Sequence, residues 1–344
     1  MDYNSCKLKK NLFINQREIN LDSSKRIDLL KDWLYKKLEI DFSISTASSD
    51  ASFRSYFRIK TLEDSFIVMD APPQNESIES FLKIGKMLNS IEVNVPHIYQ
   101  EDRALGFILM QDFGNNTYLD VLNDDNQQRL YDDSIKSLIH MQKFVKKDFC
   151  PSYTNKILFD EMVLFIEWYL RKYKKIELSN KEYEELITWI EEVSKKVSSQ
   201  EKFFVHRDYH SRNLMIQKSN NPGILDFQDA LVGPITYDLV SLLKDAYIEW
   251  DEEIVLDHAV RYWEKAKSNN LITNLEFSTF YKDFECMGIQ RHLKILGIFA
   301  RLSIRDKKNQ YLENIPLIEK YLMDATERYR DFHKIRNFLD KVIK

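Results

Sequence analysis

The stretch FFVHRDYHSRNLMIQ (203–217) decides the fold of this chain. An apolar run leads into a polar loop, and a second apolar run leaves it. Asp226 lies 13 residues beyond Asn213, in the apolar run ILDF (224–227), and the intervening NNPG (220–223) is rich in turn-forming residues. The pattern predicts a β-hairpin whose two ends bring Asn213 and Asp226 face to face.

Asp208, Asn213 and Asp226 carry the side chains that phosphoryl transfer to a hydroxyl requires. A carboxylate must orient the hydroxyl and accept its proton, and oxygen ligands must hold Mg²⁺ against the nucleotide phosphates. Asp208 suits the first role, as catalytic base, while Asn213 and Asp226 suit the second, as metal ligands. Asp, four residues, Asn, a hairpin and then Asp-Phe is the order of a kinase catalytic centre. The sequence therefore predicts a kinase that uses ATP and Mg²⁺.

The same loop offers a zinc site as an alternative. His206, Asp208 and His210 alternate along it, and Asp226 could supply a further ligand. No cysteine or second histidine cluster lies nearby in the sequence, so the ligand count favours the kinase over a metallohydrolase. We expect His206 to pack at the base of the loop and to hydrogen-bond to the backbone.

Composition narrows the class of protein. The 344 residues, 44% of them hydrophobic, are enough for two domains or lobes. Fifty basic and 54 acidic residues are mixed along the chain, which leaves no broad electrostatic footprint for nucleic acid or an anionic membrane. Three widely spaced cysteines argue against a disulfide framework, and no apolar run resembles a signal peptide or a membrane span. We expect a cytoplasmic globular protein.

The chain changes character near residues 111–114. The elements expected before this point are helices over 25–38 and 76–88 and strands over 52–59, 66–69, 95–99 and 107–110. Helical periodicity dominates after about residue 117, with short strands expected only over 203–205, 213–217 and 223–227. We expect an α+β fold of two lobes with a ligand cleft between them. It comprises an appendage (1–24), a small β-rich lobe that covers the nucleotide (25–112) and a larger helical lobe with the catalytic loop, metal site and substrate pocket (113–344).

Beyond the catalytic loop, several longer segments carry a family resemblance. They are SDASFRSYFR (49–58), VMDAPP (68–73), HRDYHSRN (206–213), LDFQDALVGPITYDLVSLL (225–243) and GIQRHLKILGIFARL (288–302). With them the chain resembles the aminoglycoside phosphotransferase family of small-molecule kinases, from about residue 26 to the C-terminal region. The resemblance implies the bilobal protein-kinase-like fold of that family.

Within the family, the segment 288–302 points to kinases of N-acetylated amino sugars. The resemblance implies ATP-dependent phosphorylation of the anomeric hydroxyl of N-acetylmuramate or N-acetylglucosamine, in the recycling of peptidoglycan. By position, it implies that Asp229 touches the metal or the sugar and that Asp238 braces the catalytic loop through hydrogen bonds. It also implies that the connector 110–114, with Met110 and Asp112, meets the adenine.

The sequence departs from the kinase pattern at the nucleotide phosphates. None of its seven glycines forms a phosphate-binding loop, so the hairpin near 50–58 must cover the phosphates with Ser52 and its backbone. Met69 occupies the position of the phosphate-binding lysine, which removes a positive charge. Arg54 or Arg58 could restore that charge, because guanidinium binds phosphate well. Each arginine could equally be a solvated strand residue.

The sequence says least about which residues contact the acceptor. Arg291 and His292 are candidates for the sugar pocket, beside Asp229, although most of the segment 288–302 reads as a core-facing helix. An aminoglycoside or another small alcohol is the first alternative acceptor. A catalytically silent nucleotide-binding protein is the second alternative, and the missing lysine suggests it.

Overall fold

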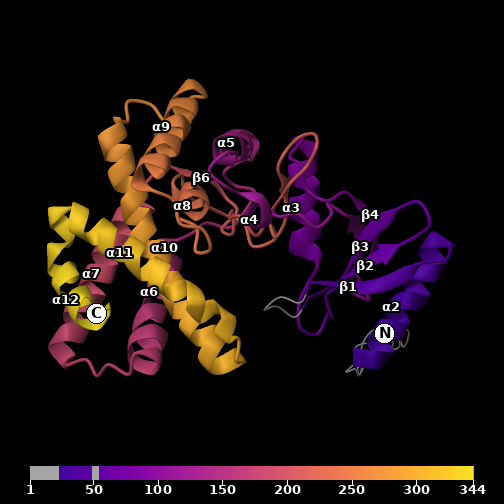
Figure 1. Ribbon diagram of the computed structural model, residues 1–344, viewed down its shortest axis with the longest axis horizontal. Coiled ribbons are helices and arrows are strands. Elements are labelled where there is room, and N and C mark those ends of the chain that lie inside the picture. Colours follow the sequence, from indigo (N-terminus) through magenta and orange to yellow (C-terminus); the bar gives the residue numbers. More distant parts are fainter. Residues whose placement is uncertain (1–22, 49–53, 344) are drawn as a thin grey trace, which may run out of the picture. The chain divides into compact units, whose positions relative to one another are not determined.

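The computed structural model describes residues 23–48 and 54–343, so Ser52 and nearly all of the expected appendage lie outside the described residues. The described residues divide into two compact units. One contains residues 23–78 and 97–112, apart from the gap, and the other contains residues 79–96 and 113–343. The first unit is an antiparallel sheet with one helix, and the second is mostly helical (Figure 1), which confirms the α+β class.

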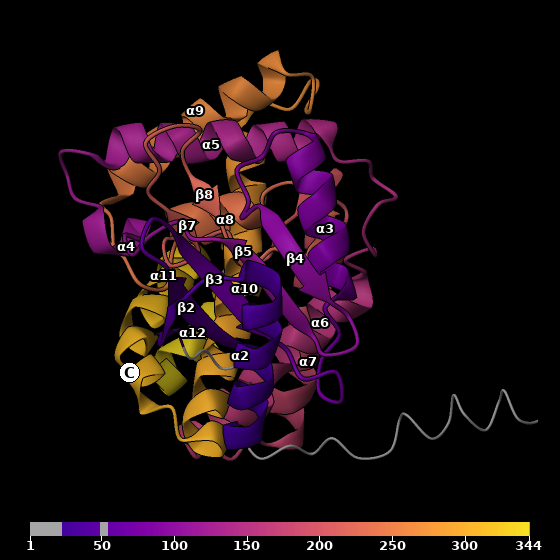
Figure 2. The same cartoon turned by 90° about the vertical axis from the view of Figure 1, so that its right-hand side faces the viewer.

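The smaller unit is built from one helix and five strands. They are α2 (Ser23–Leu38), β1 (Ser43–Ser48), β2 (Ser55–Lys60), β3 (Ser65–Asp70), β4 (Ile98–Asp102) and β5 (Phe107–Gln111). The strand order is β1-β2-β3-β5-β4, and every neighbouring pair is antiparallel. Figure 2 shows α2 lying along one face of this sheet.

The core of this unit lies between α2 and the sheet. Its buried members are Leu30, Trp33, Leu34, Ile59, Val68, Phe107 and Leu109. Burying such side chains contributes roughly 1.5–3 kcal/mol each. A buried ion pair also joins the helix to the sheet, with Arg26 Nε 2.8 Å from Asp70 Oδ1. The guanidinium of Arg26 lies 4.8 Å from the centroid of the Phe107 ring. Together these contacts fix α2 to the end of β3.

In the smaller unit and α3, three differences from the sequence-based element boundaries are the clearest. The second helix, α3, runs over Glu79–Ser90 and not 76–88, and regular pairing of β4 begins at Ile98 and not at residue 95. The first strand, β1, was not expected, because its sequence SISTAS is polar and only pairing with β2 makes it a strand. Intrinsic β-propensity depends strongly on such context.

The larger unit contains α3 and the remaining elements. Its helices are α4 (Tyr118–Val121), α5 (Gln127–Phe144), α6 (Asn155–Leu164), the π-helical η1 (Phe165–Tyr173), α7 (Asn180–Ser198), α8 (Tyr237–Leu243), α9 (Glu252–Ser268), α10 (Phe277–Asp306), η2 (Asn309–Asn314), α11 (Ile315–Arg328), η3 (Arg330–Phe332) and α12 (His333–Ile343). Its strands are β6 (Lys202–Val205), β7 (Leu214–Met215), β8 (Gly223–Ile224) and β9 (Leu231–Pro234), paired as β6-β9 and β7-β8. Of these strands, β9 was not expected.

The helix α10 organises this unit, packing against α6, η1, α7, α8 and α11 (Figure 1). Gly297 allows α10 to approach α6 closely, since a Cβ there would lie 2.4 Å from the carbonyl carbon of Leu164. The expected sugar-pocket segment 288–302 is thus the buried centre of the longest helix.

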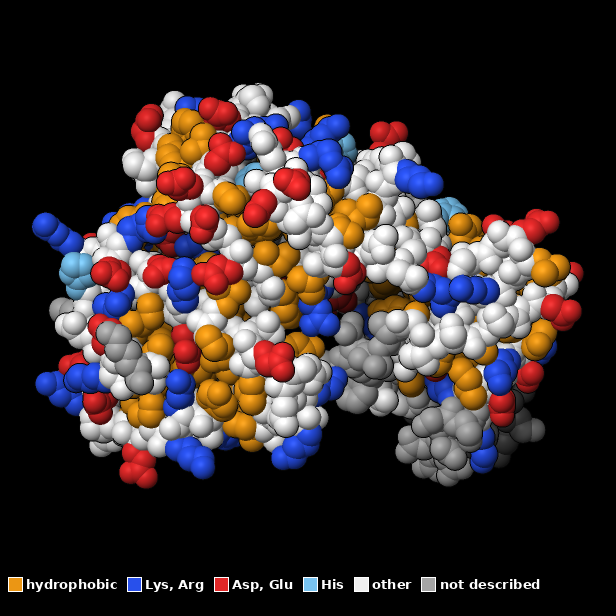
Figure 3. Space-filling view, in the orientation of Figure 1, with side chains coloured by type: hydrophobic (Ala, Val, Ile, Leu, Met, Phe, Trp, Pro, Cys, Tyr) orange, Lys and Arg blue, Asp and Glu red, His pale blue; other side chains and the backbone are white. Residues whose placement is uncertain are grey.

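On the face in Figure 3, Lys and Arg side chains are interspersed with Asp and Glu side chains. None of the described helices combines the length and the apolar character needed to cross a bilayer.

Candidate active site

The catalytic loop joins β6 to the hairpin β7–β8. Leu214 pairs with Ile224 and Met215 with Gly223, and the Leu225 N–H donates to the Asn213 carbonyl at 2.9 Å. This register confirms the predicted hairpin. It brings Asn213 Nδ2 to 3.5 Å from Asp226 Oδ2, at the open end of the hairpin.

Hydrogen bonds within the loop hold Asp208 beside this hairpin end. The Asp208 carbonyl accepts from His210 N at 3.1 Å and from Asn213 Nδ2 at 2.9 Å. The backbone is strained on both sides of the site, with φ of +79° at Arg207 and +61° at Asp226. Such conformations cost about 1–3 kcal/mol each and cluster at functional sites. The site therefore concentrates Asp208, Asn213 and Asp226 at one place in the larger unit.

Two buried aspartates of the α8 region clamp the loop from beneath. The Asp238 carboxylate accepts from His206 N at 2.6 Å and from Arg207 N at 3.0 Å. Seven residues further on, Asp245 accepts from Ser211 N at 2.9 Å. Asp238 braces the start of the loop, as the resemblance implied, and Asp245 braces its far side.

The charges around Asp208 favour its ionised form. Burial alone would raise its pKa, but Lys294, His210 and Arg291 outweigh burial and hold the pKa of Asp208 below its ordinary value. Burial lowers the pKa of His206 to about 4, which leaves that imidazole neutral near pH 7. A carboxylate that stays ionised can accept a proton from a hydroxyl group placed beside it.

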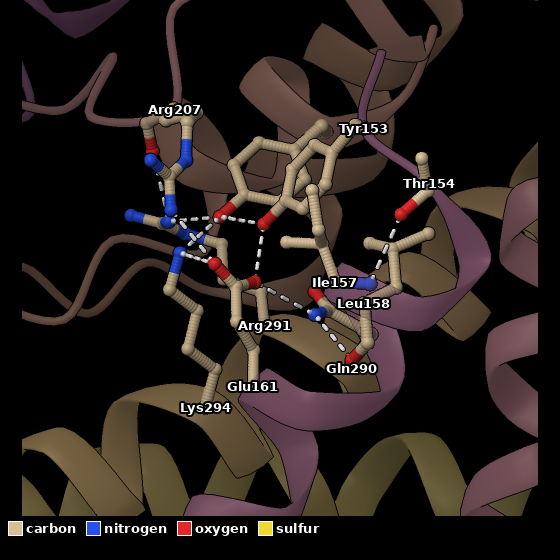
Figure 4. Close-up of polar contacts among 10 residues, drawn as sticks. Tyr153, Thr154, Ile157, Leu158, Glu161, Arg207, Gln290, Arg291 and Lys294 are labelled. Atoms are coloured by element: carbon tan, nitrogen blue, oxygen red, sulfur yellow. Dashed lines mark hydrogen bonds and ion pairs between the residues drawn. The ribbon is translucent and has the colours of Figure 1, made fainter. Parts of the chain in front are cut away.

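A buried polar cluster adjoins the loop and joins it to α6 and α10 (Figure 4). Glu161 is its centre, with Arg207 Nη2 at 2.7 Å and Lys294 Nζ at 3.1 Å. The Tyr153 hydroxyl donates to Glu161, and Arg291 Nη1 donates to the Arg207 carbonyl at 3.1 Å. Burial opposes ionisation of Glu161, but the two cations prevail and lower its pKa. We name these five residues the Glu161 cluster.

The hairpin end fits a magnesium ion. Mg²⁺ takes hard oxygen ligands and uses one or two protein carboxylates beside the substrate phosphates. Asp226 and Asn213 offer one carboxylate and one amide oxygen at adjacent positions, and Gln228 Nε2 donates to Asp226 Oδ1 at 2.7 Å, which orients that carboxylate. The described residues contain no group of three or more His, Cys, Asp or Glu arranged for a metal.

The candidate nucleotide residues of the smaller unit have protein partners. Arg58 pairs with Asp112 through Nε at 2.7 Å and Nη2 at 2.9 Å, and the buried Arg54 pairs with Glu76. Met110 is buried within β5. Met69, at the position of the missing lysine, is fully buried in β3.

The three candidate substrate residues lie in different surroundings. Asp229 is exposed and lines a cavity of about 280 Å³ in the larger unit, together with Arg207. Arg291 belongs to the Glu161 cluster. His292 lies elsewhere on α10, where its ring stacks on Tyr321 at 5.2 Å and its Nε2 is 3.4 Å from the Lys244 carbonyl. The structure therefore brings Arg291, but not His292, to the catalytic loop.

Sequence reasoning missed three residues that support the site. Tyr153 and Tyr237 are buried and share the polar contacts around Glu161, Lys294 and Arg291. Tyrosines in apolar context carry no local signal for such a role. Asp245 was recoverable in principle, because it lies only seven residues after Asp238, just beyond the end of α8.

The fold and this site together define a phosphotransferase. The model of the phosphotransferase enzyme family matches residues 43–268, and the chain belongs to this family. An N-acetylmuramate/N-acetylglucosamine kinase of Neisseria meningitidis is 40% identical over 320 residues, covering 91% of this chain and 95% of the relative. A protein of the same name from Pseudomonas aeruginosa is 41% identical over 296 residues, covering 85% and 86%.

Solved structures of low sequence identity share the fold. An ethanolamine kinase of Plasmodium vivax superposes with a TM-score of 0.63 at 13% identity, covering 93% of this chain and 98% of that one. A choline kinase of Streptococcus pneumoniae gives 0.62 at 12% identity, covering 86% and 98%. At these identities the likeness concerns the fold.

Proposed function

We propose that this protein transfers the γ-phosphate of ATP to the anomeric hydroxyl of N-acetylmuramate and N-acetylglucosamine. The single observation that carries the proposal is the 40% identity, over 91% of the chain, to a kinase named for these two sugars. The side chain of Asn213, which donates to the Asp208 carbonyl and lies beside the Asp226 carboxylate, brings the three residues together and supports the reaction type. We place the activity in the cytoplasm, where ATP and recycled cell-wall sugars meet.

In this mechanism Asp208 orients the anomeric hydroxyl and accepts its proton. Asn213 and Asp226 would hold Mg²⁺, which would neutralise charge on the nucleotide phosphates. The loop hydrogen bonds and the two clamping aspartates keep these groups in place before the substrate arrives, which lowers the entropic cost of the reaction. Met110 and Asp112 are proposed to meet the adenine, with Ser52, Arg54 or Arg58 near the phosphates. Asp229 and Arg291 are proposed to contact the sugar.

The charges near the site favour a neutral or anionic acceptor over an aminoglycoside. Arg207, Arg291 and Lys294 place three cations close to Asp208, and Glu161 pairs with two of them, Arg207 and Lys294. A polycationic acceptor would be repelled by this group of charges.

The buried Met69 favours a second candidate, a nucleotide-binding protein without turnover, because no lysine occupies its position. One experiment separates the candidates: ADP release is followed with Mg-ATP and N-acetylmuramate, N-acetylglucosamine, other hexoses or aminoglycosides. We expect turnover with the two N-acetylated sugars, reduced about 10²–10⁴-fold in Asp208→Asn while ATP still binds. ATP binding without turnover on any acceptor would favour the second candidate. Turnover only with aminoglycosides would identify an aminoglycoside, and not an N-acetylated sugar, as the acceptor.

A further inference from the structure

The cavity beside Asp229 extends from the catalytic loop to α3. Its volume is about 280 Å³, which is enough for a substituent of a sugar ring. Arg207 and Gln228 contribute to its wall from the catalytic side, and Ser80 and Lys83 contribute from α3. All of these residues belong to the larger unit.

The cavity adjoins the reacting groups through both residues of its catalytic wall. Arg207 directly precedes Asp208 in the chain, and the Gln228 side chain donates to Asp226. A substrate whose hydroxyl meets Asp208 can therefore place another part of its ring in this cavity.

The lining carries more positive than negative charge. Lys83 and Arg207 are cations, and Asp229 is the one carboxylate among the lining residues. Cys150 also lines the cavity, but burial raises the pKa of its thiol to about 11, so it stays neutral.

Both cations retain hydrogen-bonding capacity. The Lys83 ammonium donates to the Phe149 carbonyl at 3.2 Å and lies 4.7 Å from the Phe149 ring, so two of its three donors have no hydrogen-bond partner in the part of the chain that the structure describes. Arg207 Nε is buried and has no hydrogen-bond partner among the described residues. Gln228 Oε1, also buried without a described partner, shows that the polar atoms of this wall are not all satisfied internally.

We propose that this cavity is the subsite for a carboxylate carried by the acceptor sugar, bound by Lys83 and Arg207. The inference rests on the proposed function and sharpens it. N-acetylmuramate carries a lactyl ether with a carboxylate, whereas N-acetylglucosamine has a hydroxyl at the same ring position. The subsite therefore distinguishes the two acceptors by charge, because the loss of one of its cations weakens the binding of the acidic sugar only.

The test is Lys83→Met, with Lys86→Met as the matched control. Both lysines are exposed on α3, one turn apart, but only Lys83 lines the cavity. kcat/KM is measured for N-acetylmuramate, its methyl ester and N-acetylglucosamine. Lys83→Met should lower kcat/KM for N-acetylmuramate about tenfold and leave the ester and N-acetylglucosamine unchanged, since a charged hydrogen bond is lost only with the free acid. Lys86→Met should leave all three unchanged.

An equal change for all three acceptors in Lys83→Met, or no change, would overturn the proposal. Inhibition of the wild type by inorganic phosphate that disappears in Lys83→Met, with the acceptor ratio unchanged, would also overturn it and assign the cavity to free phosphate. Failure of the proposed function is distinguishable, because the wild type would then turn over neither sugar.

Discussion

At the scale of single residues, Asp238 couples the catalytic loop to pH. Burial raises its pKa to about 7, against the opposing effect of the two backbone N–H groups of His206 and Arg207. The ionised carboxylate is the better acceptor for both groups, so protonation loosens the start of the loop. Asp208 does not titrate in this range, because its pKa is lowered. We therefore expect Asp238 to set the acidic limb of activity.

We predict that kcat falls as the pH decreases through about 7 and that stability changes in the opposite sense. Between pH 3.8 and about 7 the folded state keeps a proton on Asp238 that the unfolded chain has released. The free energy of unfolding therefore decreases as the pH rises across this window, by at most about 1.4 kcal/mol per pH unit from this group. Kinetics and urea denaturation over the same pH series test both signs.

Asp238→Asn is the control for this pH dependence. It should have a lower kcat without the acidic limb near pH 7. A wild-type kcat that stays flat between about pH 6 and pH 8 would remove Asp238 from the control of activity.

At the scale of elements, α8 and the turn after it hold the catalytic loop on two sides. Asp245 accepts from Ser211 N with one oxygen and from Tyr247 N, at 3.1 Å, with the other. Asparagine at this position keeps only one accepting oxygen, so one backbone N–H loses its partner. Ser211 lies two residues before Asn213, and the proposed magnesium ligand shifts with it.

We predict that Asp245→Asn raises the Mg²⁺ concentration needed for the half-maximal rate. It should also lower kcat about tenfold, because a misplaced metal ligand reduces the stabilisation of the transition state by roughly 1.4 kcal/mol. The matched control is Glu285→Gln, since Glu285 is a buried carboxylate 2.7 Å from Lys244 Nζ. It should lower the melting temperature without moving the Mg²⁺ midpoint. If Asp245→Asn likewise leaves that midpoint unchanged, Asp245 acts on stability alone.

At the scale of the whole molecule, α10 determines how the larger unit packs. Gly297→Ala would place a methyl group 2.4–2.6 Å from backbone atoms of Leu164, which cannot move aside as a side chain can. We predict a loss of about 1–3 kcal/mol from overpacking, measured as a lower denaturation midpoint. Gly288→Ala is the control on the same helix.

The control substitution has ordinary space, because the nearest atom to the added carbon is His292 Cε1 at 3.7 Å. Alanine in a helix interior is about 0.5–1 kcal/mol more favourable than glycine, so Gly288→Ala should be neutral or stabilising. Equal denaturation midpoints for the two variants would contradict the prediction and show that α10 and α6 can shift apart to accommodate the added methyl group.

The core of the site could be predicted because its residues are close in sequence. The hairpin that brings Asn213 to Asp226 follows from two apolar runs and the turn between them, and backbone pairing then fixes the register. The α+β division followed in the same way from a change of periodicity near residues 111–114. The strands β1 and β9 could not be predicted, because each is a strand only by pairing with a partner.

The catalytic loop with Asp208 is thus what the sequence by itself determined, since local spacing sets the geometry of a loop and a short hairpin. The tertiary structure alone decided the partners of the charged residues. Arg58 pairs with Asp112 and Arg207 pairs with Glu161, and these partners are 54 and 46 positions apart in the sequence. A charge in a sequence has many possible partners, and only the packing of helices and strands chooses among them, because a buried charge must find its counterion within a few ångströms.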